Sequence, residues 1–160
     1  MLRTNPLPHP TLYLFQVGRV KNMRHTLGLD NEENPNAFVL KYGYTKNLLR
    51  RTNEHTKTYG RLPNAHLRLK YHVYVPPPYL RVAEQDVEHF FKETGLYLPH
   101  KRYTELIVAT PHELNTIVRE IYAHIGIRYA ISDSFAGQNK KQLYNSNSNN
   151  ASNNNICKVF

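Results

Sequence analysis

The sequence predicts an α+β fold: a small mixed or antiparallel β-sheet flanked by helices. Residues 66–75 alternate apolar and polar side chains with the two-residue period of a half-buried strand. Residues 79–94 and the segment after residue 110 carry apolar side chains at helical spacing. Apolar runs of strand length at 11–17, 37–44 and 103–109 supply the rest of the expected sheet.

Local signals mark where the first elements begin and end. Gly18 is expected to end the first strand, and residues 20–27 after it are a candidate short helix. Thr45 is expected to cap the helix that follows the second strand, with Leu48 and Leu49 facing inward. The predicted order of the main elements is β, β, α, β, α, β, α.

The third strand and the last helix carry the clearest patterns. One predicted face of the strand is wet and basic, with Arg68 and Lys70. The other face is apolar and consists of Leu67, Leu69, Tyr71, Val73 and Val75. Before the last helix, Thr110 and Glu113 have the spacing of a capping box, and Pro111 suits the first turn.

Composition sets the boundaries of the expected domain. Residues 1–10 hold three prolines and are predicted to be an extended leader, and 132–160 form an Asn/Ser-rich tail with little to bury. The folded core is expected over 11–131. No apolar run approaches the roughly 18 residues of a membrane span, and the N-terminus lacks the apolar block of a signal peptide. We therefore expect an intracellular protein with no membrane partner.

The charge balance favours a polyanionic partner. Lys and Arg total 21 against 12 acidic residues, which gives a net charge of +9. An ordinary basic protein without such a partner is the plain alternative. The single cysteine, Cys157, excludes an internal disulfide and a Cys-rich zinc site. The predicted basic, DNA-binding surface consists of Lys46, Arg50, Lys57, Arg68 and Lys70.

One segment of the sequence carries recognisable chemistry. The second strand ends in Lys41-Tyr42-Gly43, and the helix after it carries Arg51 and His55 four residues apart. Residues at this spacing share a helix face, so a guanidinium and an imidazole project together. A planar guanidinium fork is suited to gripping a phosphate.

This segment resembles the second half of the signature of GIY-YIG endonucleases. Lys41-Tyr42-Gly43 stands at the second tripeptide, with Arg51 at the spacing of the catalytic arginine, and Thr11-Leu12-Tyr13 resembles the first tripeptide. The similarity is greatest to a GIY-YIG-like domain of large DNA virus and phage proteins that often accompanies KilA-N or Bro-type domains. Two departures are Lys41 in place of a tyrosine and a longer spacer between the tripeptides.

The resemblance implies hydrolysis of DNA phosphodiester bonds with one divalent ion, Mg²⁺ or Mn²⁺. It implies that Tyr13 is the general base, that Arg51 stabilises the phosphate, and that His55 and Tyr42 orient base and phosphate. Lys41 and Arg51 are expected to lower the pKa of Tyr13, whose ordinary value of about 10 makes it a poor base.

The resemblance also implies a metal-binding glutamate on a later helix, where Glu84 and Glu88 are the candidates. Relative to Leu80, Glu84 lies at about 40° on a helical wheel and Glu88 at about 80°. Glu84 therefore points more toward the apolar stripe, and Glu88 is the fallback. The alternative for either residue is an ion pair with a nearby Lys or Arg.

Two further functions remain open beside the nuclease. The same fold with catalysis lost would be a DNA-binding module, and a virion interaction protein would use the basic charge alone. DNA is the expected partner of the nuclease and of the DNA-binding module. A second copy of the chain or a separate DNA-binding domain are further candidates. The resemblance implies a viral protein in the cytoplasm or nucleus of a host cell, or in the virion.

Overall fold

A computed structural model describes residues 9–32 and 34–132, and the predicted α+β class is confirmed. The five-stranded sheet has the order β3-β1-β2-β5-β4, and all its neighbouring strands are antiparallel. The strands are β1 (Thr11–Arg19), β2 (Phe38–Thr45), β3 (Arg68–Tyr74), β4 (Tyr97–Leu98) and β5 (Leu106–Ala109). The predicted leader and tail fall almost entirely outside the described residues.

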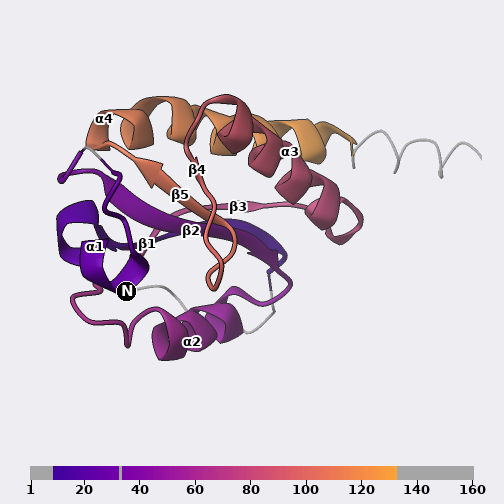
Figure 1. Cartoon of the computed structure of the whole chain (residues 1–160). Helices are drawn as coiled ribbons and strands as arrows, with labels where there is room; N and C mark the ends of the chain where they lie inside the picture. Colours follow the sequence, from indigo (N-terminus) through magenta and orange to yellow (C-terminus); the bar gives the residue numbers. More distant parts are fainter. Residues whose placement is uncertain (1–8, 33, 133–160) are drawn as a thin grey trace, which may run out of the picture.

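Helices cover both faces of this sheet (Figure 1). On one face lie α1 (Val20–Leu27) and α2 (Leu48–Thr58). On the other lie α3 (Leu80–Glu93), which follows a 3-10 turn (Pro77–Tyr79), and a long C-terminal helix. That helix begins as α4 (Pro111–Glu113), passes through a π turn (Leu114–Val118) and continues over 119–132. None of the helices in the described part of the chain has the length and apolar character needed to cross a bilayer.

Two separate hydrophobic clusters hold the layers together. The larger lies between the sheet and the pair formed by α3 and the C-terminal helix, where Phe91, Val118 and Tyr122 are fully buried. The smaller packs α1 against the sheet through residues such as Val20 and Met23. The predicted apolar stripe of α3 is confirmed, because Leu80, Ala83, Val87 and Phe91 are all buried.

Several predicted boundaries hold and others are wrong. The capping box of Thr110 and Glu113 is present. Gly18 does not end the first strand, because a bulge between Gln16 and Gly18 absorbs the irregularity and β1 continues to Arg19. The predicted strand over 103–109 begins only at Leu106, and the short β4 was not predicted.

The start of α2 also differs from the prediction. Asn47, and not Thr45, caps the helix by accepting a hydrogen bond from the Arg50 amide at 3.0 Å. The Thr45 hydroxyl instead bonds the backbone of Asn47 in the preceding turn. Leu49 faces solvent with 70% of its surface exposed, so the prediction that it faces inward is wrong.

A second bulge divides the predicted apolar face of β3. The register shifts between Leu14 and Phe15 of β1, which pair with Tyr71 and Leu69. A shift of one residue sends the following side chains to the other face. Leu67 therefore packs in the smaller cluster, whereas Tyr71 and Val73 pack in the larger one.

Candidate active site

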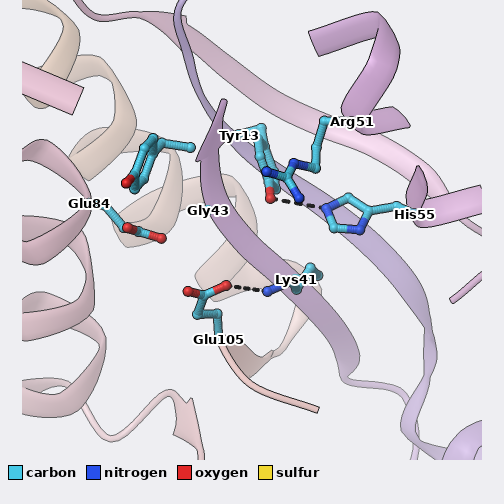
Figure 2. A pocket seen from close by; sticks show the side chains of 8 residues that line it. Tyr13, Lys41, Gly43, Arg51, His55, Glu84 and Glu105 are labelled. Atoms are coloured by element: carbon cyan, nitrogen blue, oxygen red, sulfur yellow. Dashed lines mark hydrogen bonds and ion pairs between the residues drawn. The ribbon is translucent and has the colours of Figure 1, made fainter. Parts of the chain in front are cut away.

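The candidate site is a cavity of about 360 Å³ at the edge of β2. β5 pairs with β2 only from Phe38 to Lys41, so the sheet opens beyond this point. Side chains from α2 enter the opening from one side of the strand and Glu84 of α3 enters from the other (Figure 2). The lining residues are Tyr13, Lys41, Gly43, Tyr44, Arg51, His55, Glu84 and Glu105.

Tyr13 and Gly43 fit against each other at the centre of the site. They are direct partners in the β1–β2 pairing, and the Tyr13 side chain crosses the Cα of Gly43. A Cβ added at Gly43 would lie 2.5 Å from Tyr13 Oη. Only glycine at this position therefore lets the phenol lie where it does.

His55 holds the phenol of Tyr13 in place. Its Nε2 lies 3.0 Å from Tyr13 Oη, and its ring meets those of Phe15 and Tyr59 edge-on at 5.3 and 5.5 Å. Burial, together with the nearby charges of Lys41 and Arg51, lowers the pKa of His55 from 6.5 to about 4. The imidazole is therefore neutral at neutral pH, and Nε2 can accept the phenolic proton.

The pKa of Tyr13 moves in the direction opposite to the prediction. Burial raises it well above its ordinary value of 10.0. The charge of Arg51 opposes this rise, but Glu105 and Glu84 add to it. Lys41 was expected to lower the pKa of Tyr13 as well, but this effect is absent because Glu105 pairs with that lysine. Tyr13 is thus a protonated phenol in the resting site.

Arg51 has hydrogen-bond donors that are not fully used at the mouth of the cavity. Its Nη1 lies 3.1 Å from Glu54 Oε2, one turn along α2. Its Nε is buried and has no hydrogen-bond partner among the described residues. A buried donor left without a partner is costly, so the guanidinium is suited to an anionic ligand that fills the cavity.

Lys41 and Glu105 form an ion pair that the sequence did not predict. Lys41 is only 6% exposed, and its Nζ donates both to Glu105 and to the Thr104 carbonyl at 3.1 Å. Burial lowers the pKa of Lys41, and the bond to Glu105 opposes that effect. Glu105 adopts a left-handed backbone with φ of 59°, which is uncommon outside glycine. A buried lysine requires an acidic partner, and that requirement was the available signal for Glu105.

Two carboxylates face the same cavity, and the nearby cations balance only part of their negative charge. Burial, and then the charge of Glu105, raise the pKa of Glu84 from 4.5 to about 7. Mg²⁺ keeps most of its waters and takes only one or two protein carboxylates. Among the described residues no group of three or more His, Cys, Asp or Glu could form a complete metal cage. Glu84 and Glu105 nevertheless match the sparse ligand set that Mg²⁺ prefers.

Two predicted site residues lie outside the cavity. Tyr42 points to the opposite face of β2 because side chains alternate along a strand. There its ring packs against Phe91 at 5.3 Å, and its hydroxyl has no hydrogen-bond partner in the described part of the chain. Glu88 pairs with Lys92 on the exposed side of α3. Tyr42 therefore cannot orient a phosphate in this arrangement, and Glu84 is the better placed of the two glutamates.

The five predicted DNA-binding residues do not share one surface. Lys46 is exposed in the turn before α2, and Arg50 and Lys57 are exposed on α2 itself. The ammonium of Lys70 lies 5.7 Å above the Phe38 ring, which packs in the cluster on the opposite side of the sheet from α2. Arg68 pairs with Gln16 on β1, next to the bulge that reverses the strand face. The bulge is therefore the reason that the predicted continuous basic surface is divided.

Comparison with known proteins finds relatives in a mimivirus. Over 99 residues the chain is 46% identical to the uncharacterized protein L5 of Acanthamoeba polyphaga mimivirus, an alignment that covers 62% of this chain and 22% of L5. It is 40% identical over 111 residues to the uncharacterized protein L12 of the same virus, covering 69% of this chain and 23% of L12. A third relative, the uncharacterized protein R865, is 38% identical over 87 residues.

The chain therefore spans less than a quarter of the length of these viral relatives. No family model and no solved structure matches the chain. The similarity relates the protein to viral proteins, and its activity has to be argued from the site.

Proposed function

We propose that the protein is a metal-dependent endonuclease of the GIY-YIG type that hydrolyses phosphodiester bonds in DNA. The observation that carries the proposal is the convergence of Tyr13, His55, Arg51 and Glu84 on one cavity from three different elements. Phosphoryl hydrolysis requires a general base, here two side chains that act together, a cation that clamps the phosphate, and a carboxylate. The net charge of +9 suits a polyanionic substrate.

In the proposed reaction Tyr13 and His55 move the proton of the attacking water. The water gives its proton to Tyr13 Oη while the phenolic proton passes to His55 Nε2 across their 3.0 Å hydrogen bond. This relay avoids a free phenolate, which burial of Tyr13 makes costly. The hydroxide forms the new bond to phosphorus as the bond to the leaving oxygen breaks.

Arg51 stabilises the charge that builds on the phosphate oxygens. Its buried Nε and its exposed guanidinium edge supply donors to the cavity. Glu84, with Glu105 beside it, would hold a divalent ion that neutralises the leaving oxygen. Lys41 holds Glu105 toward the cavity and balances part of the carboxylate charge.

Cleavage of supercoiled plasmid DNA with Mg²⁺ or Mn²⁺, and with EDTA instead, tests this proposal. Arg51→Ala should lower the rate by at least about a hundredfold, since one clamping group contributes on the order of 3 kcal/mol to a transition state. Arg81→Ala is the matched control, because Arg81 is an exposed arginine of α3 that lines neither the cavity nor the predicted DNA-binding surface. Equal loss of activity in both variants would refute the role of Arg51.

A DNA-binding module without catalysis is the second candidate. The burial that keeps Tyr13 protonated favours it, because a module that only binds has no need of a base. Metal-independent binding with no nicking by the wild-type protein, at any divalent ion, would favour this candidate.

A further inference from the structure

A second cavity of about 540 Å³ lies beside the candidate active site. It is bounded by the C-terminal end of α2 and by the segment 102–104 that leads into β5. Three cations, Lys57, Arg61 and Arg102, line it together with two tyrosines. No acidic residue is among the lining groups. Of these residues only Lys57 was predicted to bind DNA.

The three cations of this cleft lack acidic partners. In the described part of the chain none of Lys57, Arg61 and Arg102 forms an ion pair, whereas Arg51, earlier on α2, pairs with Glu54. All three are exposed. Three uncompensated positive charges around one cavity favour an anionic ligand.

The segment that carries Arg102 is held in a fixed position. His100 Nδ1 accepts hydrogen bonds from the amides of Arg102 and Tyr103 at 3.1 and 3.0 Å. Its Nε2 then carries the proton and donates to the Leu27 carbonyl at 3.2 Å, which ties the segment to the end of α1. The Arg102 guanidinium lies 5.4 Å above the Tyr103 ring. The cation is thus placed at the cleft before any ligand arrives, which lowers the entropic cost of binding.

The cleft and the active-site cavity share a wall. Tyr59 lines the cleft, and its ring meets that of His55, which lines the cavity, at 5.5 Å. Thr104 lines the cleft, and its carbonyl accepts a hydrogen bond from Lys41 of the cavity. A ligand that occupies both must therefore carry a second anionic group close to the first.

We propose that this cleft binds the sugar-phosphate backbone of the DNA strand next to the phosphate held in the active-site cavity. A polynucleotide carries phosphates at regular short intervals along each strand. Arg61 and Arg102 each contact a flanking phosphate, and Lys57 adds charge at the rim. The inference rests on the proposed function for the position of the reacting phosphate, but the binding step can be measured without cleavage.

Fluorescence anisotropy with a labelled DNA duplex, in EDTA, tests the cleft. We expect Arg61→Ala/Arg102→Ala to weaken binding at least about tenfold and to make the log–log salt slope shallower by roughly 2, since each lost phosphate contact removes about one. The control is Arg81→Ala/Arg119→Ala, which removes the same charge from exposed residues of α3 and the C-terminal helix. The control should bind within about threefold of the wild type. Equal weakening of both double variants would overturn the proposal.

A competition experiment separates a backbone site from a pocket for a free nucleotide. Deoxynucleoside monophosphate and inorganic phosphate should displace the duplex only at millimolar concentration. Displacement at micromolar concentration that is lost in Arg61→Ala/Arg102→Ala would show a mononucleotide site and overturn the proposal. If the wild type fails to cleave but the two double variants still differ in binding, the nuclease proposal fails and the cleft proposal stands.

Discussion

Replacing Glu84 by glutamine tests the carboxylate pair in the absence of any DNA. Burial and the neighbouring Glu105 raise the pKa of Glu84 from 4.5 to about 7. The folded protein therefore disfavours the ionised form, and stability is lost as the pH rises from about 4.5 to about 7. A rise of this size corresponds to about 3 kcal/mol, and partial exposure of the carboxylate to solvent reduces it to roughly 1–2 kcal/mol. Glutamine keeps the shape of the side chain, and because it does not ionise it removes this loss of stability.

We expect Glu84→Gln to match the wild type at pH 4.5 and to exceed it by roughly 1–2 kcal/mol at pH 8, without divalent ions. Urea unfolding in EDTA at several pH values measures this difference. His55 gives the wild type an opposite slope between pH 6.5 and 4, and subtraction of the two curves cancels it. Glu88→Gln is the matched control, because Glu88 lies one turn along α3, outside the cavity.

Divalent ions should reduce the difference in stability between the two proteins. A ligand at ten times its Kd stabilises the native state by about 1.4 kcal/mol, or roughly 3–6 °C in Tm. Mg²⁺ or Mn²⁺ should therefore raise the Tm of the wild type and of Glu88→Gln, but not of Glu84→Gln. Two results together would refute this role of Glu84. They are a stability difference between Glu84→Gln and the wild type that is the same at every pH, and an unchanged response to the metal ion.

Three further changes probe the site and its support. Gly43→Ala places a methyl group 2.5 Å from Tyr13 Oη, so we expect a loss of about 1–3 kcal/mol in urea unfolding and a loss of cleavage. Gly126→Ala is its control, because the nearest atom to the added Cβ lies at 3.5 Å. Cleavage should stay near the wild type, and stability should be unchanged or up to about 1 kcal/mol higher, since alanine is favoured over glycine within a helix. His55→Gln should lose less stability than the wild type when the pH falls from 6.5 to 4, because the wild type must protonate a histidine whose pKa burial lowers to about 4; parallel acid unfolding curves would contradict this. Thr110→Ala should cost about 1 kcal/mol, seen as a lower urea midpoint, because it removes the capping box of the C-terminal helix; an unchanged midpoint would show that the cap contributes nothing.

Patterns within one element could be predicted from the sequence. The stripe of α3 and the cap at Thr110 depend on neighbouring residues alone, and both are present. The pairing of Arg51 and His55 on one helix face follows from their spacing, and both line the cavity. The helical wheel also predicted that Glu84 points inward more than Glu88.

Features that depend on pairing between strands could not be predicted. Tyr42 is a different case, because strand alternation alone places it on the face opposite to Lys41 and Gly43. The family signature had instead suggested that Tyr42 is a site residue. The bulge beside Leu69 is a property of two strands, and alternation along one strand cannot reveal it. Glu105 reaches the cavity only because β5 pairs with the part of β2 that carries Lys41. Likewise the pKa of Tyr13 depends on burial, and the linear sequence shows only the charges near it.

The burial of Tyr13 between β2 and α2 has a consequence for how this protein tolerates mutation. Tyr13 is 2% exposed and packs against Phe15 and His55, so its replacement lowers the amount of folded protein and also removes the proposed proton relay. Arg51 and Glu84 lie at partly exposed positions of the cavity, where replacement changes chemistry with little loss of folded protein. A lineage that no longer needs the reaction can therefore lose the arginine and the glutamate readily. The tyrosine would persist in its descendants as a packing residue, long after its proton had ceased to matter.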